Sequence, residues 1–251
     1  MPTGTNETEV SWLVERLRLS VFFKNNPLPE NMESWWNSMS IESEESVRKP
    51  LYRESGKFGN GQLVMSNQPL RIDWIYEPYK PSEQYQPFPN IGSWSDTVEA
   101  FSSRVENWLT NITEVKRLAF GTVLLCPSEN RMDGYDRISR FLPDITIRNE
   151  GESDFFFQIN RPRNSVTQLP DLKINRLSKW AVMLLQKIQF TLESGQQVIS
   201  LPKTMQYANR LELDINTSPE YTNDLPNHLL PELFKELVSL AKEIAILGDI
   251  P

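Results

Sequence analysis

Hydrophobic and polar residues alternate along several stretches of the chain, which predicts β-strands. In residues 14–23, Leu17 and Leu19 alternate with Arg16 and Arg18. A period of two places the hydrophobic side chains on one face of a strand and the polar ones on the other. The same reasoning predicts strands in residues 62–78 with a break at 67–69, and in residues 115–125, 154–162, 171–186, 189–201 (with a turn at Ser194–Gly195) and 209–216.

Other stretches repeat every three or four residues, which is typical of amphipathic helices. The strongest lies in residues 228–247, with Leu230, Leu233, Leu237, Leu240, Ile244 and Leu247 in register and Gly248 after them. Residues 93–109 show the same spacing, and Ser95 is in a position to cap that helix. Shorter helices are predicted in residues 27–39 and 132–142.

Two segments show neither the period of two of a strand nor the spacing of three or four residues of a helix. Residues 40–60 are acidic and contain glycines near their end, so we predict a loop. Residues 77–92 are rich in proline, and Tyr79, Tyr85 and Phe88 lie among the prolines. Proline prevents regular sheet pairing, so this segment is predicted either to contact a protein partner through those rings or to fold back over a sheet edge.

Strands and helices mix without a regular strand–helix alternation, which favours an α+β fold with mainly antiparallel sheets. An internal duplication is a further hypothesis. A shift of about 100 residues aligns residues 14–23 with 115–125 and "LRID" (70–73) with "LKIN" (172–175). The predicted unit is strand, helix, two strands, helix. Residues 1–112 would form the first repeat and residues 113–251 the second, with inserted strands, either as two units or as one compact domain.

Composition and charge restrict the function. The chain has 251 residues and a net charge of −7, whereas a general polyanion binder would be basic. No stretch is apolar for long enough to form a membrane helix, and the first residues do not resemble a signal peptide. We therefore predict a cytoplasmic protein with no membrane contact. Its oligomeric state cannot be inferred from the sequence.

The sequence lacks the residues that several kinds of catalysis require. The chain has one Cys, Cys126, and one His, His228, which excludes zinc sites made of Cys and His clusters. His228 falls at the start of the last predicted helix and Cys126 at the end of an apolar strand, so neither is predicted to be catalytic. Glycine-rich phosphate-binding motifs are absent. We predict no catalytic residue, no metal and no cofactor.

Two alternatives remain open. Asp144, Asp171 and Lys173 fit a loose pattern of metal-dependent nucleases, in which carboxylates hold magnesium and a lysine positions water. Glu212 and Asp214 share a strand face and are a weaker candidate metal pair. The other alternative is RNA binding, in which aromatic and basic side chains on a sheet stack on and neutralise a strand. Its candidate residues are Phe155, Phe156, Phe157, Arg161, Arg163, Lys173, Arg176 and Lys179.

Some phrases of the sequence resemble known proteins. "RIDWIYEP", "RLAFGTVLL", "QINRPRNS", "LKINRLSKW" and "LELDINTSPE", with a closing helix and "GDIP", resemble a sporadically distributed prokaryotic family of uncharacterised proteins of about this size. The resemblance implies a bacterial or archaeal source and an α+β fold, and it carries over no activity. The leading interpretation is a non-catalytic interaction or regulatory subunit of a prokaryotic multi-protein system, with host defence as one setting and a protein as the expected partner.

Overall fold

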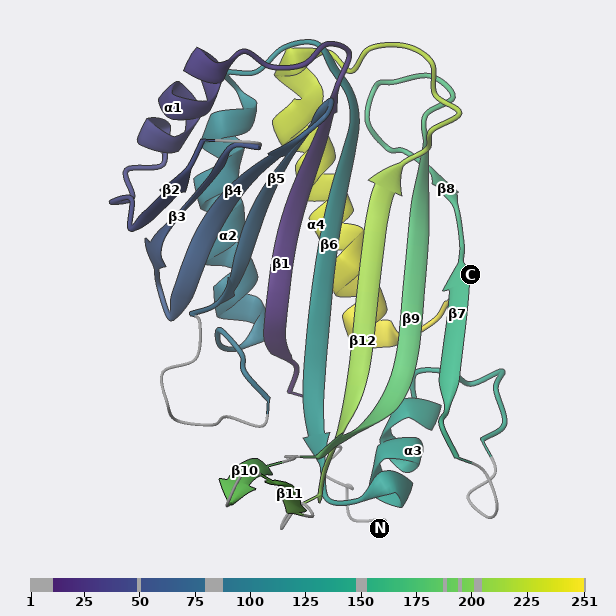
Figure 1. The fold of residues 1–251 in the computed structure, drawn as a ribbon. Coiled ribbons are helices and arrows are strands. Elements are labelled where there is room, and N and C mark those ends of the chain that lie inside the picture. Colours follow the sequence, from purple (N-terminus) through teal and green to yellow (C-terminus); the bar gives the residue numbers. More distant parts are fainter. Residues whose placement is uncertain are drawn as a thin grey trace.

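A large antiparallel sheet forms the centre of the molecule in the computed structural model (Figure 1). The structure describes residues 11–48, 51–79, 88–147, 153–186, 189–193, 196–200 and 205–250. Ten strands belong to the sheet, in the order β2-β3-β4-β5-β1-β6-β12-β9-β7 with β8 beside β9. Their bounds are β1 Leu13–Phe23, β2 Glu45–Val47, β3 Arg53–Phe58, β4 Gly61–Gln68, β5 Arg71–Pro78, β6 Val115–Ser128, β7 Phe156–Asn160, β8 Arg163–Asn164, β9 Lys173–Gln186 and β12 Met205–Thr217. A separate hairpin contains β10 (Gln189–Glu193) and β11 (Gln196–Ser200).

The helices pack on one face of this sheet. They are α1 Pro29–Ser38, α2 Trp94–Leu109, α3 Arg131–Ser139 and α4 Leu230–Leu247, with a 3₁₀ turn, Asn227–Leu229, before α4. In Figure 1, α2 and α4 lie behind the strands, and among the described residues no helix lies on the near face of the sheet. Tryptophans dominate the interface: the ring of Trp74 in β5 lies 6.1 Å from Trp36 in α1 and 5.5 Å from Trp108 in α2. The α+β class with a mainly antiparallel sheet is confirmed.

The C-terminal helix follows the predicted pattern. Leu230, Leu233 and Leu237 are fully buried, and Phe234 packs its ring 5.9 Å from Phe120 of β6. Gly248 ends the helix with a φ of 84°, a conformation that side chains with a Cβ rarely adopt. The chain therefore stops its helix where the sequence predicted, and the buried stripe packs against the sheet.

Local predictions were wrong at two places. Residues 40–60 are not a continuous loop, because they contain β2 and β3, which pair with each other, and β3 also pairs with β4. β2 is the edge strand and its three residues are exposed. In β3 the buried residues are Glu54, Ser55 and Gly56, so neither strand shows an apolar alternation. The cap of α2 is Ser93 and not Ser95: the Ser93 hydroxyl accepts a hydrogen bond from the Asp96 N–H. The predicted turn at residues 194–195 lies outside the described residues.

The specific alignment behind the duplication hypothesis is wrong. "LRID" leads into β5, which pairs with β1, whereas "LKIN" leads into β9, which is separated from β6 by β12. Short β patterns match by chance because every strand has the same period. Outward from β1 the order is β5, β4, β3, and outward from β6 it is β12, β9, β7. The predicted boundary at 112/113 falls between α2 and β6, and the duplication itself stays a prediction.

No helix within the described residues is both long and apolar enough to cross a membrane.

Candidate functional site

The face of the sheet opposite the helices is the candidate site, and we call it the open face. It is defined here by twenty side chains from the five central strands. They alternate with the buried core positions and are aligned by the cross-strand register. These are Arg71, Asp73, Ile75 and Glu77 of β5; Arg16, Arg18, Ser20 and Phe22 of β1; Arg117, Ala119, Gly121 and Val123 of β6; Arg210, Glu212, Asp214 and Asn216 of β12; and Lys173, Asn175, Leu177 and Lys179 of β9.

One end of the open face is held by an aromatic ring between two arginines. Phe22 pairs with Arg71 on one side and Arg117 on the other. The guanidinium carbons lie 5.8 Å and 5.0 Å from the centre of the Phe22 ring, within the range of cation–π attraction. In the adjacent row, Ser20 donates a hydrogen bond of 2.5 Å to Asp73. These contacts hold side chains flat on the sheet, so this end is closely packed.

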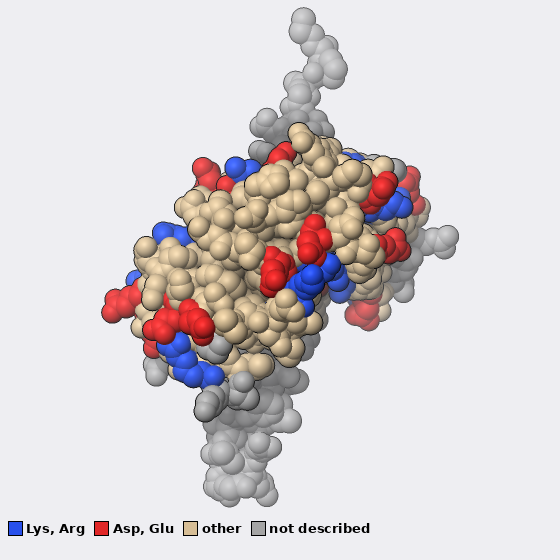
Figure 2. Space-filling view, turned by 90° about the horizontal axis from the view of Figure 1, so that it is seen from above, with Lys and Arg blue, Asp and Glu red and all other residues tan. Residues whose placement is uncertain are grey.

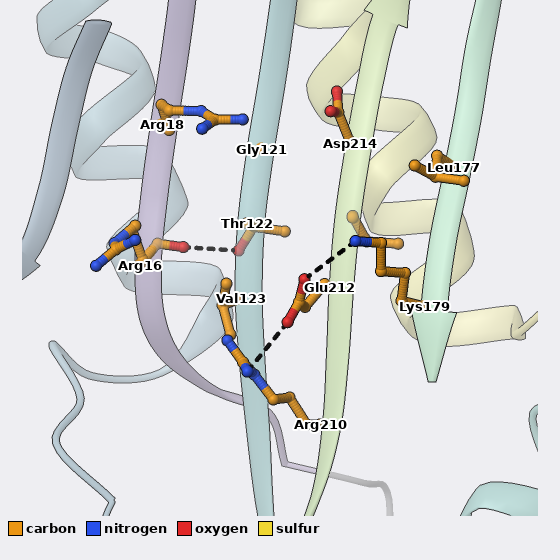
Figure 3. A pocket seen from close by; sticks show the side chains of 11 residues that line it. Arg16, Arg18, Gly121, Thr122, Val123, Leu177, Lys179, Arg210, Glu212 and Asp214 are labelled. Atoms are coloured by element: carbon orange, nitrogen blue, oxygen red, sulfur yellow. Dashed lines mark hydrogen bonds and ion pairs between the residues drawn. The ribbon is translucent and has the colours of Figure 1, made fainter. Parts of the chain in front are cut away.

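The centre of the open face is hollowed. The register places Arg18, Gly121 and Asp214 side by side on β1, β6 and β12. A cavity of about 250 Å³ lies over them, and Figure 3 shows Arg18 extending from β1 toward Gly121. A glycine inside a strand often marks a place where another group approaches the backbone closely. Here that group is the Arg18 guanidinium: a Cβ on Gly121 would lie 3.4 Å from its Nη2 and 3.5 Å from its Nε.

Ion pairs surround this cavity. On the rim, Arg16 pairs with Glu77 at 3.2 Å. Glu212 receives Lys179 at 3.8 Å and Arg210 at 3.0 Å, as the dashed lines of Figure 3 mark. Such exposed pairs contribute little stability, typically about 0–1 kcal/mol. Their consequence is electrostatic: of the four described cations that line the cavity, Arg16, Lys179 and Arg210 already have a carboxylate partner.

Arg18 is the exception. It makes no hydrogen bond or ion pair with any described residue, and its Nε is buried without a partner. Asp214 also has no cation partner among the described residues. Its carboxylate accepts a 3.0 Å hydrogen bond from the side-chain amide of Asn216. A buried donor without a partner costs about 1–3 kcal/mol, so the described residues leave the Arg18 guanidinium incompletely satisfied.

The open face carries excess positive charge although the whole chain is acidic. Seven of its twenty side chains are Lys or Arg, and four are Asp or Glu. Glu15, from a bulge in β1, adds one more carboxylate by pairing with Arg210 at 3.6 Å. Since the chain has a net charge of −7, the rest of the molecule is strongly acidic. The open face is therefore the surface suited to an acidic partner.

The predicted nucleic-acid residues do not share one surface, which corrects the assumption behind that alternative. Arg176 is 2% exposed and points toward the helices, where its Nη2 lies 3.1 Å from Glu243 of α4. Burial and the neighbouring Arg163 lower the pKa of the Arg176 guanidinium. Arg161 makes two hydrogen bonds, of 2.7 and 2.8 Å, with Asp249.

Arg163 also turns to the helix side, with its Nη2 2.7 Å from Glu243. These three arginines thus bind the C-terminal helix and the segment after it to the sheet. Only Lys173 and Lys179 of the candidate cations lie on the open face. On β9, side chains alternate between the two faces of the sheet. Lys173 and Lys179 therefore face away from the helices and Arg176 faces them, although the three residues look like one basic group in the sequence.

The three consecutive phenylalanines divide in the same way. Phe156 is 63% exposed, whereas Phe155 and Phe157 are partly buried against the core. The Phe155 ring lies 6.2 Å from Tyr135 of α3. They do not all face one side of the strand, because side chains alternate, so the three rings do not form one stacking platform for bases.

The proposed contact loop is described only at its ends. Tyr79 is 46% exposed, and its hydroxyl donates to Glu44. Phe88 is half-buried. Tyr85 lies outside the described residues. Beyond Phe88 the chain packs along β1, where Ile91 N–H donates to Val14 and Val14 N–H donates to Gly92.

The nuclease alternative gains no metal site: within the described residues, no group of three or more Asp, Glu, His or Cys is arranged to hold a metal ion. Asp144, Asp171 and Lys173 are exposed. Glu212 of the weaker pair is occupied by two cations. His228 is exposed and Cys126 is 4% exposed, as the sequence indicated.

The end of the molecule seen in Figure 2 offers no charged platform either. Acidic and basic side chains lie beside each other among mostly uncharged residues, without a block of one sign. Lys24 and Lys116, for example, both pair with Asp224. A polyanion would find no continuous basic surface among the described residues of that end.

Comparison with known proteins does not assign the chain to a family. No family model matches the chain, and neither a curated protein nor a solved structure matches it. The candidate site therefore rests on its geometry. Sequence patterns did not find the Arg18–Gly121 pair, although a glycine within the apolar stretch "LAFGTVLL" was a signal of close approach.

Proposed function

We propose that the protein is a non-catalytic interaction or regulatory subunit that binds an acidic protein partner on its open face. The observation that carries this proposal is a broad sheet face on which no described helix packs. The cations of this face outnumber its carboxylates, although the chain is acidic. Partly exposed apolar side chains, among them Phe22, Ile75, Val123 and Leu177, lie between the charges. Arginine mixed with aromatic and aliphatic groups is typical of protein interfaces.

The finer parts of the proposal come from the sequence. A cytoplasmic prokaryotic multi-protein system, with host defence as one setting, is the context implied by the family resemblance. Tyr79, Tyr85 and Phe88 remain a second candidate contact region, and an origin by internal duplication remains a hypothesis. RNA binding stays the alternative, supported on the open face by Lys173 and Lys179.

The test compares charge reversals on the two faces. Tagged wild-type protein is used to capture partners from a lysate of the native host, followed by mass spectrometry and an absorbance measurement for nucleic acid. One variant carries Arg16→Glu and Lys179→Glu on the open face. Its matched control carries Lys235→Glu and Lys242→Glu on the exposed side of α4, with the same change in net charge.

We expect a specific protein to be captured by the wild type and by the α4 variant and to be lost with the open-face variant. Both variants should melt as the wild type does, because they alter exposed ion pairs. A captured protein that binds all three forms equally would refute the open face as the binding surface. Nucleic acid in place of protein, lost with the open-face variant, would favour the alternative.

A further inference from the structure

We propose that the cavity over Gly121 binds a carboxylate group of an aspartate or glutamate side chain from the partner protein, with Arg18 as the recognising cation. This inference rests on the proposed function and specifies the chemistry of its central contact. It assigns a role to a side chain that no described residue pairs with.

Arg18 is prepared to receive an anion. A guanidinium presents its N–H groups in a planar fork that matches the two oxygens of a carboxylate. The other cations of the cavity are already satisfied, Arg16 by Glu77 and Lys179 by Glu212. Because Arg18 makes no hydrogen bond or ion pair with any described residue, a carboxylate can bind its Nη groups without breaking an existing contact.

Gly121 makes this position of the guanidinium available. The Arg18 Nη2 and Nε lie in van der Waals contact with the place that a Cβ would occupy, at 3.4 and 3.5 Å. A Cβ at this position would only touch the guanidinium, but it would take up the floor of the cavity, where the carboxylate binds. The glycine is therefore a part of the site, and not only a tolerated residue of β6.

The size and the charges of the cavity select the ligand. At about 250 Å³ it lies below the range of about 300–1,000 Å³ that holds drug-sized ligands, so one side chain is the appropriate occupant. Asp214 and Glu212 line the same cavity. These carboxylates repel a doubly charged phosphate more strongly than a singly charged carboxylate, and a single negative charge matches Arg18, the one lining cation that no described residue pairs with. Asp214 can then accept a hydrogen bond from an amide N–H of the incoming chain.

The direct test observes the Arg18 side chain by NMR. The full chain is labelled with ¹⁵N-arginine, and its Nε–H signal is assigned by its absence in Arg18→Gln. The probe is glutamate blocked at both ends (N-acetyl, N-methylamide), and the matched control probe is the blocked glutamine. We expect a saturable shift of the Arg18 signal with a dissociation constant on the order of millimolar for the glutamate probe, and no saturable shift with the glutamine probe.

Variants measure the contribution of each residue to affinity for the blocked glutamate. In these titrations the shifts of backbone amides around the cavity report binding. Arg18→Gln should weaken binding at least tenfold, and Gly121→Ala should weaken it several-fold. Lys235→Gln removes the same charge from the helix side and should leave the affinity unchanged. Urea unfolding of each variant shows whether it keeps the fold.

Three results would overturn the proposal: equal shifts with glutamate and glutamine probes, no shift of Arg18 with either, or tighter binding of inorganic phosphate than of the blocked glutamate. If Arg18 does not respond while the open-face charge reversals still abolish partner capture, the carboxylate contact is wrong and the binding face stands. The reverse, a saturable Arg18 response with unchanged capture, would refute the binding face and the protein source of the carboxylate.

Discussion

Shortening Leu237 to alanine tests how much of the fold depends on the C-terminal helix. Leu237 is fully buried in α4, between Leu233 and Ala241 on the stripe that faces the sheet. The change removes three carbon atoms from the core and leaves a cavity, because neighbouring strands cannot close completely around it. Leucine-to-alanine changes at such sites cost about 2–5 kcal/mol. Since whole domains are stable by about 5–15 kcal/mol, this is a large fraction.

The assay is urea unfolding at equilibrium, followed by tryptophan fluorescence. Two of the core tryptophans, Trp74 and Trp108, lie between the sheet and the helices. A loss of this size should lower the urea midpoint by about 0.7–2.5 M if the slope is near 2–3 kcal/mol per molar. Ile246→Ala is the matched control, because Ile246 lies in the last turn of the same helix and is 67% exposed. Its effect should stay within about 0.5 kcal/mol.

The competing explanation of the leucine pattern is a zipper between two copies of the chain. A zipper uses a narrow seam at two positions of each heptad. In α4 the buried stripe is wider, since Phe234, Val238 and Ala245 are buried as well. An unchanged urea midpoint for Leu237→Ala, together with conversion of a dimer to a monomer in light scattering, would refute the assignment of α4 to the core.

Three further changes test particular contacts by the same unfolding measurement. Gly248→Ala should cost at least about 1–3 kcal/mol, because φ is 84° there and a Cβ would lie 2.3 Å from the Phe141 carbonyl oxygen; a neutral result would show that this turn is not fixed. Trp12→Phe should cost about 1–3 kcal/mol, since the indole N–H donates a buried 2.9 Å hydrogen bond to a carbonyl of α4 that would lose its donor. Burial raises the pKa of the Asp133 carboxyl, but hydrogen bonds from Arg137 and a backbone N–H outweigh this and lower the pKa below its ordinary value. The stabilisation by that carboxylate is therefore present above about pH 4 and lost as the pH falls through the lowered pKa, so the stability difference between wild type and Asp133→Asn should shrink in acid, and a constant difference would contradict it.

Most individual elements could be predicted from the sequence because their signals are local. A period of two located β1 and β12, and a spacing of three and four residues located α2 and α4. Local signals failed in residues 40–60, where two strands rich in polar side chains resemble a loop. Local signals also failed in the alignment of "LRID" with "LKIN", because any two strands have the same period and align at some shift.

The open face could not be predicted, since it depends on contacts between distant parts of the chain. Arg176 and Lys179 are three positions apart on β9, and alternation alone shows that they face opposite sides. Which side is solvent is decided by α4, more than fifty residues later, whose Glu243 receives Arg176. The Arg18 cavity needs two further long-range facts. Gly121 must stand beside Arg18 in register, and Asp214 must stand beside Gly121.

Both facts follow from strand order and register, and neither strand order nor register is set by the local pattern. A shift of β6 by one residue against β1 would place Phe120 or Thr122 beside Arg18, and the buried Phe120 would then turn away from α4. Burial of the core side chains on the helix side therefore fixes the geometry on the opposite side. The stability of the core and the shape of the candidate site are consequences of the same register, so variants that shift it should lose both.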